Sequence, residues 1–206
     1  LGYKAWMIKD YFLTHQFAAN DFTLNLGTHA AQFTRPEEAR DDFEITFVDT
    51  GAEALTSERL LRVGYLLQNK PFMVTYGDGV SDVSIQKLVE HHIRMRETHG
   101  VIGTLTGIHP KSKYGLVLTD DQDRVTRFAQ YPQLPDYTNG GFMVFEPEFL
   151  AHCRAETMVE DTIIEVANLQ KMALYRHEGF WHCMDTVKDK EDLEKLWKTD
   201  PAWKTW

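Results

Sequence analysis

The chain has 206 residues, of which 43% are hydrophobic, the size and composition of one globular domain spanning residues 1–206. Its formal net charge of −9 argues against a nucleic-acid-binding protein, although free nucleotides remain compatible with it. No segment reaches the roughly 20 apolar residues of a membrane span, and the N-terminus has no apolar signal core, so we expect a soluble, cytoplasmic protein without a membrane partner.

The first elements predicted along the chain are a helix and two strands. Residues 4–17 carry large apolar side chains at three- and four-residue spacings, which predicts an amphipathic helix packed on a sheet. Residues 21–33 alternate and then break at a glycine, which favours a short strand and a turn, and the acidic segment 36–42 is expected to be a loop. Residues 43–48 (FEITFV) predict the next strand.

The middle of the chain alternates helices and strands. Residues 53–68 place leucines and a valine on one helical stripe. The apolar run 72–76 (FMVTY) has the length of a buried parallel strand. A further helix is expected from a cap at Ser81-Asp82 to about His99, followed by a strand over residues 101–108.

The pattern changes after Pro110. Segments 116–118, 125–128 and 140–145 are predicted to be consecutive strands with short connections. A β-rich segment of about residues 110–145 is therefore expected to be inserted into the α/β pattern.

The C-terminal part returns to alternating elements, with a helix at 159–170, a strand at 172–176 and a helix at 188–197. The whole pattern predicts an α/β fold with helices on both faces of a sheet and a β-rich excursion. The two cysteines, Cys153 and Cys183, are far apart and lack CxxC spacing, which favours structural roles over a disulfide or a zinc site.

Two aspartates at strand ends are the candidates for chemistry, because ligands of open α/β sheets bind beyond the carboxyl ends of the strands. Asp78 lies in the segment Tyr76-Gly77-Asp78-Gly79, whose glycines let a ligand approach the backbone, although a turn aspartate is the alternative. Asp185 precedes the last helix and could instead be its N-cap. If the two carboxylates converge, they could hold one Mg²⁺ ion for phosphoryl or nucleotidyl transfer.

Four segments follow one another along the chain: VDTG (48–51), YGDGV (76–80), NGGF (139–142) and GFWHCMDTVKDK (179–190). In order and approximate separation they resemble segments of glucose-1-phosphate cytidylyltransferases, which belong to the sugar-1-phosphate nucleotidyltransferase family, and the closing LEKLWKTDPAWKTW is also similar. The element FW-x-x-MDT, in register with the other three, makes the likeness specific, and it covers nearly the whole chain.

The resemblance implies a Rossmann-like mixed sheet of the nucleotidyltransferase (GT-A-like) type with a β-rich insertion. It also implies a reaction in which a sugar 1-phosphate, here glucose 1-phosphate, attacks the α-phosphorus of CTP to give a CDP-sugar and pyrophosphate, with Mg²⁺ as the cofactor. The implied partners are these two substrates and further copies of the chain, since family members are commonly homo-oligomers.

The resemblance further assigns roles to individual residues. Asp78 and Asp185 match the catalytic positions that hold the metal in the family. The positions implied to face the sugar are Tyr76, Gly77, Tyr114, Gly115, Asn139, Gly140 and Trp181, and those implied to contact the nucleotide are Thr50 and Gly51. For Trp181, a buried core aromatic is an equal alternative.

Three departures from the family pattern affect the expected activity. Family members begin with a strand and a glycine-rich loop that cradles the triphosphate, and this sequence has no such segment, so we expect a chain lacking that N-terminal portion and inactive in this form. Gln130-Tyr131-Pro132 stands where the family has Glu-Lys-Pro, which removes a lysine expected to meet the sugar phosphate. Residues 56–59 lack the glycines found there in the family.

Two alternatives remain open at this point. The missing lysine also fits a non-catalytic homologue that binds a sugar nucleotide or a partner subunit. A metal-dependent glycosyltransferase with a related α/β fold would likewise place carboxylates on a metal, and transfer from a sugar nucleotide would distinguish it.

Overall fold

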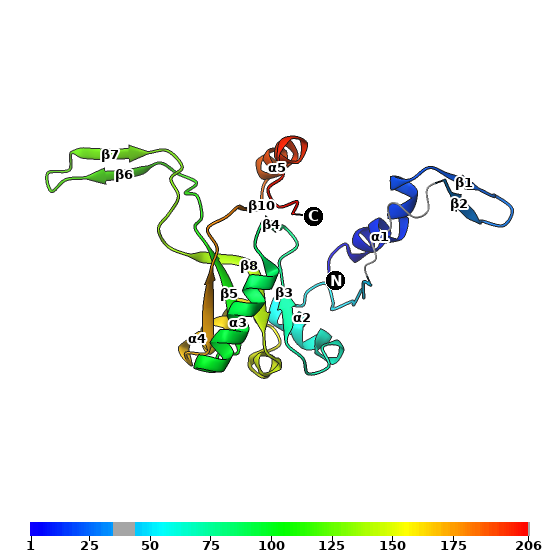
Figure 1. Ribbon diagram of the computed structural model, residues 1–206, viewed down its shortest axis with the longest axis horizontal. Helices are drawn as coiled ribbons and strands as arrows, with labels where there is room; N and C mark the ends of the chain where they lie inside the picture. The colour runs from blue at the N-terminus through cyan, green and yellow to red at the C-terminus, as the bar shows by residue number, and fades with distance from the viewer. Residues whose placement is uncertain (35–43, 206) are drawn as a thin grey trace.

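The centre of the molecule is a four-stranded mixed sheet (Figure 1), seen in a computed structural model that describes residues 1–34 and 44–205. Its strands, in spatial order, are β3 (Phe72–Val74), β8 (Thr138–Phe145), β5 (Gly103–Ile108) and β9 (Met172–Arg176). β8 runs antiparallel to β3 and β5, whereas β5 and β9 are parallel. This arrangement confirms the mixed α/β sheet expected from the sequence.

Helices cover both faces of this sheet. On one face lies α3 (Ile85–His99), whose His92 Nδ1 is 2.8 Å from Thr104 Oγ1 of β5. On the other face lie α2 (Thr56–Val63) and α4 (Val159–Asn168), which contact each other, and the 3₁₀ turn η1 (Gly64–Leu66) follows α2. Among the described residues no helix is both long enough and apolar enough to cross a membrane.

The main hydrophobic core lies between the sheet and α4. Phe72, Met143 and Phe145 project from the strands, and the stacked rings of Phe145 and Phe149 have centroids 3.8 Å apart. Phe149 belongs to the 3₁₀ segment η2 (Pro147–His152). Burying each such side chain contributes about 1.5–3 kcal/mol to stability, so this core fixes the strands that position the site.

A smaller antiparallel pair of strands lies beyond the carboxyl ends of β3 and β9. It consists of β4 (Gly79–Ser81) and β10 (Trp181–Cys183), and α5 (Val187–Thr199) follows β10 directly. β4 continues the chain from β3, and β10 continues it from β9. The two acidic candidates therefore come from segments that this small sheet joins.

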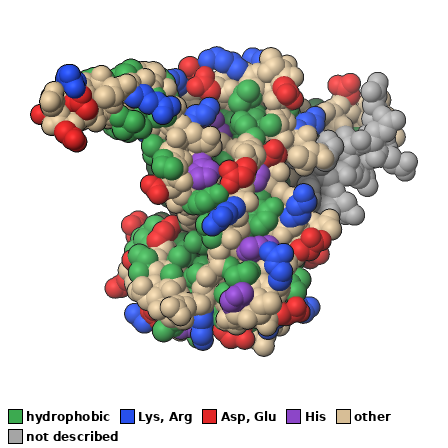
Figure 2. Space-filling model, turned by 60° about the vertical axis from the view of Figure 1, so that its left-hand side comes forward, with side chains coloured by type: hydrophobic (Ala, Val, Ile, Leu, Met, Phe, Trp, Pro, Cys, Tyr) green, Lys and Arg blue, Asp and Glu red, His purple; other side chains and the backbone are tan. Residues whose placement is uncertain are grey.

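A β-hairpin formed by β6 (Leu116–Thr119) and β7 (Val125–Ala129) projects from one side of the molecule. Figure 2 shows hydrophobic side chains along this hairpin, and Val125 and Phe128 are more than 60% exposed. The β-rich excursion ends before Thr138, not near residue 145, because β8 pairs with two strands of the central sheet.

An N-terminal arm extends in the opposite direction in Figure 1. It contains α1 (Ala5–Ala19) and the hairpin of β1 (Phe22–Leu24) and β2 (Ala31–Phe33). The prediction of a helix here is confirmed. The prediction that this helix packs on a sheet was wrong, because α1 has no buried residue. Among the described residues, Phe12 of α1 contacts Phe47, and Phe17 contacts Phe22 and Phe33 of the hairpin.

The strand predicted at residues 43–48 is not found. Phe43 and the predicted loop at 36–42 lie outside the described residues, and the rest of this segment pairs with no described strand. Thr50 N instead donates a hydrogen bond to Leu1 O at 2.9 Å. A sequence with strand propensity forms a ladder only where a partner strand lies beside it.

Two further expectations were wrong in detail. The strand at 72–76 was expected to be buried and parallel, but β3 covers only Phe72–Val74, its central Met73 is exposed, and its neighbour β8, which inserts between β3 and β5, runs antiparallel. Ser84 caps α3 in place of Ser81-Asp82, and it accepts a hydrogen bond from Lys87 N at 3.3 Å.

Candidate active site

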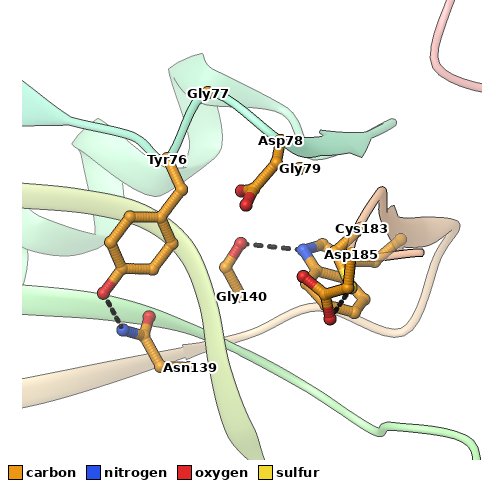
Figure 3. A pocket seen from close by; sticks show the side chains of 9 residues that line it. Tyr76, Gly77, Asp78, Gly79, Asn139, Gly140, Cys183 and Asp185 are labelled. Carbon is orange, nitrogen blue, oxygen red and sulfur yellow. Dashed lines mark hydrogen bonds between the residues drawn. The ribbon is translucent and has the colours of Figure 1, made fainter. Parts of the chain in front are cut away.

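Asp78 and Asp185 line the same cavity, which has a volume of about 460 Å³ (Figure 3). The antiparallel pairing of Cys183 with Gly79 places the residue before β4 beside the residues that follow β10. Met184 N also donates a hydrogen bond to Asp78 O at 2.8 Å, which extends this pairing by one residue. The two carboxylates are thus brought together by backbone pairing between segments that are distant in sequence.

Most of the cavity wall consists of residues expected from the sequence. The lining residues are Tyr76, Gly77, Asp78, Gly79, Asn139, Gly140, Trp181, Cys183 and Asp185. Gly79 is one of the two glycines expected to let a ligand approach the backbone, whereas Cys183 was expected to have a structural role and was not anticipated in the lining.

The alternative roles considered for the two aspartates do not match the structure. The N-cap of α5 is Thr186, whose hydroxyl accepts from Asp189 N at 3.2 Å, so Asp185 is not the cap. Within the described chain no hydrogen bond reaches the Asp78 carboxylate, although a turn aspartate would accept backbone N–H bonds. Both carboxylates therefore remain available to a ligand.

The thiol of Cys183 lies close to the negative charges of the cavity, and its pKa is raised. Its Sγ donates to Asp185 Oδ2 at 3.2 Å. Partial burial raises the pKa of the thiol to about 11, with further contributions from the hydrogen bond and charge of Asp185 and from the charges of Asp189 and Asp78. The thiol is therefore protonated at neutral pH and acts as a weak donor, not as a nucleophile.

The donor set fits a hard divalent cation. Two carboxylates face the cavity, and no lysine or arginine lines it among the described residues. The described chain brings together no group of three or more Asp, Glu, His or Cys side chains able to hold a metal ion. Magnesium is commonly held by one or two carboxylates while it keeps water and phosphate ligands, so the pair suits Mg²⁺ better than zinc.

A bulge in β8 forms the wall facing the two aspartates. Leu105 of β5 pairs with Met143, but Gly107 pairs with Asn139, so β8 carries extra residues between these pairs. Such bulges locally re-aim a strand. Trp181 Nε1 donates to Gly140 O at 2.8 Å, which fixes the indole against the bulge and ties β10 to the central sheet.

Tyr76 is held on this wall by a short hydrogen-bonded chain. Its hydroxyl donates to Glu160 Oε1 of α4 and accepts from Asn139 Nδ2 at 3.3 Å. Asn139 Oδ1 in turn accepts from Gly141 N at 3.0 Å. Burial, followed by the bond and charge of Glu160, raises the pKa of Tyr76. Nothing in the sequence pattern distinguished Glu160 from an ordinary acid in the first turn of a helix.

Four of the site residues implied by the resemblance lie outside the lining of this cavity. Tyr114 and Gly115 are at the base of the β6–β7 hairpin, where Tyr114 is 79% exposed. Thr50 is buried near the chain start and accepts from Arg59 Nη1 at 2.6 Å, and Gly51 follows it with a left-handed φ of 86°. Their proposed contacts with sugar and nucleotide stay predictions.

Comparison with known proteins identifies the class to which this fold and site belong. The model of the nucleotidyl transferase family matches residues 49–194, and the chain therefore belongs to that family.

Individual relatives of this chain are named for a particular reaction within that family. Glucose-1-phosphate cytidylyltransferase from Salmonella typhi is 33% identical over 210 residues, which cover all of this chain and 79% of that protein. The enzyme of the same name from Salmonella typhimurium has the same identity and coverage. Mannose-1-phosphate guanylyltransferase catalytic subunit beta of Drosophila melanogaster is 29% identical over 127 residues, covering 59% of this chain and 33% of that protein.

Solved structures share the fold at low sequence identity. A Bacillus anthracis protein studied as a glucose-1-phosphate thymidylyltransferase has a TM-score of 0.56 and 13% identity, covering 75% of this chain and 66% of its own. UDP-glucose pyrophosphorylase complexed with UDP-glucose has a TM-score of 0.52 and 13% identity, covering 74% of this chain and 65% of its own. These similarities confirm the nucleotidyltransferase type of α/β fold.

Proposed function

We propose that this chain carries the metal- and sugar-binding side of a glucose-1-phosphate cytidylyltransferase. In this reaction a phosphate oxygen of glucose 1-phosphate bonds to the α-phosphorus of CTP, and the bond from that phosphorus to pyrophosphate breaks. The observation that supports the proposal most is the convergence of Asp78 and Asp185 in one cavity, in a chain 33% identical to enzymes of that name.

Asp78 and Asp185 would hold the cation. When bound, Mg²⁺ would neutralise negative charge on the phosphate oxygens during the transfer. Among the described residues, Asp78 forms no competing side-chain bond and Asp185 accepts only from the weak thiol donor of Cys183. Little has to be broken before these carboxylates can bind a ligand.

The opposite wall would receive the sugar. Asn139 and Gly140 combine an amide with open backbone, which suits hydroxyl groups, and the Trp181 ring offers an apolar surface to the C–H face of a sugar. The hydrogen bond from Trp181 to Gly140 fixes both groups before a ligand arrives. A preorganised wall lowers the entropic cost of binding.

The direct test uses this chain with Mg²⁺ and combines two measurements. Pyrophosphate release from CTP and glucose 1-phosphate reports catalysis, and calorimetry with CDP-glucose reports binding. We expect CDP-glucose to bind, and turnover to be slow because no lysine or arginine lines the described cavity to neutralise the triphosphate. The absence of both binding and turnover would remove the proposal.

A second candidate, a non-catalytic homologue that binds sugar nucleotides, is favoured by the same lack of cationic lining. Tyr131, at the position where the family has lysine, does not line the cavity and is exposed. Tight CDP-glucose binding without any pyrophosphate release would support this candidate. Measurable turnover that depends on both substrates would exclude it.

A further inference from the structure

Glu160 is a carboxylate to which neither the sequence nor the proposed reaction assigns a role. It lies in the first turn of α4, outside the lining of the cavity, and its Oε1 accepts the hydroxyl proton of Tyr76. Its other oxygen, Oε2, is buried and has no hydrogen-bond partner among the described residues. An unpaired buried carboxylate oxygen is costly, so a purely structural tether for Tyr76 would be better served by a neutral side chain.

The carboxylate fixes the direction of the whole hydrogen-bonded chain. An ionised carboxylate can only accept, so the Tyr76 hydroxyl must donate to Glu160. The Tyr76 oxygen is then left as an acceptor, and it is the amide nitrogen of Asn139 that lies 3.3 Å from it. Asn139 Oδ1 consequently faces Gly141 N at 3.0 Å, which sets the amide in a single orientation.

Among the residues that the structure describes, this orientation leaves one N–H of Asn139 with only a weak partner. Its remaining contact is the Met143 thioether, 4.0 Å from Nδ2, and sulfur is a poor acceptor. Asn139 also lines the cavity. An oxygen of a bound ligand would therefore be a better partner for this N–H than the group that it meets now.

We propose that Glu160 is a positioning residue for sugar recognition, which acts through Tyr76 to orient the Asn139 amide as a donor toward a hydroxyl oxygen of the bound sugar. This role rests on the proposed function, because it assigns the ligand at this wall to the glycosyl group. A glutamine at this position could either accept or donate, and would hold the orientation less firmly.

The packing of Tyr76 supports a role in positioning. Its ring lies against Gly141, where a Cβ would be 2.6 Å from Tyr76 Cδ2. The ring is thus fixed by contact on one side while its hydroxyl is held by two hydrogen bonds. Figure 3 shows Tyr76 and Asn139 joined on the wall opposite Asp185.

The test measures the affinity for glucose 1-phosphate by calorimetry in the wild type and in Glu160→Leu, Glu160→Gln and Tyr76→Phe. We expect Glu160→Leu and Tyr76→Phe each to weaken binding about tenfold, the effect of losing one hydrogen bond with a charged group. Glu160→Gln should recover most of the affinity. The double variant Glu160→Leu/Tyr76→Phe should be no weaker than either single variant, because the two residues act in one chain.

Asp161→Asn is the matched control, since Asp161 is the other acid in the first turn of α4 and its side chain bonds, within the described chain, to Met158 N alone, at 2.9 Å. It removes one negative charge from the same turn and should leave the affinity for glucose 1-phosphate unchanged. Monodeoxy analogues of glucose 1-phosphate provide a second readout. The analogue lacking the recognised hydroxyl should bind the wild type and Glu160→Leu equally well.

The outcomes distinguish a failure of the proposed function from a failure of the positioning role of Glu160. A wild type that binds no glucose 1-phosphate counts against the proposed function itself. A wild type that binds it as tightly as Glu160→Leu does, or a series in which every deoxy analogue is weakened equally by Glu160→Leu, would overturn the role of Glu160 alone.

Discussion

Asp78 and Asp185 face one cavity with no described lysine or arginine on its lining, so their charges repel any phosphate unless a cation is present. We predict that Mg²⁺ strengthens the binding of CDP-glucose to the wild type and that Asp78→Asn or Asp185→Asn removes this dependence. In EDTA each variant should bind CDP-glucose at least as tightly as the wild type, because it has lost one repelling charge. Calorimetry with and without Mg²⁺ measures both effects.

Asp189→Asn provides the control for this experiment. Asp189 lies near the same cavity but caps α5 through Thr186 N at 2.8 Å. Its loss should lower stability slightly and leave the effect of Mg²⁺ intact. If Asp78→Asn retained the full dependence on Mg²⁺, the proposal that Asp78 and Asp185 hold one cation would be rejected.

Cys183 allows the same charges to be examined without a ligand. A thiol with a pKa of about 11 exposes on the order of 10²-fold less thiolate at pH 8 than an ordinary cysteine. We therefore predict slow alkylation of Cys183 by iodoacetamide in the wild type. Asp185→Asn should accelerate it, since removing that negative charge lowers the pKa of the thiol. Peptide mass spectrometry distinguishes alkylation of Cys183 from that of the buried Cys153. Equal rates of Cys183 alkylation in the wild type and in Asp185→Asn would show that the charge of Asp185 does not raise the pKa of the thiol.

Residues adjacent to a motif were predictable, whereas residues that act across the fold were not. Asp78, Asp185 and Asn139 lie in segments whose letters resemble a family, and the structure places them in one cavity. Glu160 reaches Tyr76 because α4 shares a hydrophobic core with side chains of β3 and β8, and no local pattern encodes that approach. Tyr114 was expected on the same grounds as Asn139, but it is 79% exposed and is not among the residues that line the cavity.

At the level of elements, the bulge in β8 is the feature on which the sugar wall depends. Gly141 has a φ of 83°, and a Cβ there would lie 2.6 Å from Tyr76 Cδ2. We predict that Gly141→Ala lowers the free energy of unfolding by about 1–3 kcal/mol through backbone strain, and that it weakens CDP-glucose binding by displacing Tyr76. Denaturant titration measures the first effect and calorimetry the second.

Gly77→Ala serves as the comparison for stability. A Cβ at Gly77 meets no atom within 4 Å, and Gly77 is not in the left-handed region. Its free energy of unfolding should therefore change by less than about 0.5 kcal/mol. Equal losses in the two variants would show that the bulge geometry is not what constrains Gly141.

Elements with a strong period were predicted well, and those that need a partner were not. The strand at 172–176 matches β9, and α3 and α4 match their helical stripes to within a few residues. The segment 43–48 has the composition of a strand but no partner in the described structure. β8 begins earlier than expected because its bulge breaks the alternation that marks a strand.

At the scale of the whole molecule, the order of the strands was beyond local sequence. The insertion of β8 between β3 and β5 joins segments from the middle and the later part of the chain. This order depends on pairing between strands that are far apart in the sequence. The free energy of that pairing depends on packing against other elements, which a short segment of sequence does not determine. The layer arrangement followed from the alternation of elements, whereas the direction of β3 relative to its neighbour did not.

The N-terminal arm leaves a large apolar surface in contact with water. Trp6 is 67% exposed and Leu13 is 73% exposed, and their spacing of seven residues places them on one side of α1. Covering such side chains contributes about 1.5–3 kcal/mol each, so we predict that the isolated chain associates with itself as its concentration rises. Trp6→Lys/Leu13→Lys should reduce this association in sedimentation velocity experiments.

The comparison for this last prediction is Gln16→Lys/Ala18→Lys, which adds the same two charges to exposed positions of the same helix but removes no large apolar side chain. It should associate nearly as much as the wild type, because the driving force is apolar burial and not the reduction of net negative charge. Equal loss of association in both double variants would assign the effect to charge. A wild type that sediments as a 23.9 kDa monomer at every concentration would show that this surface does not drive association.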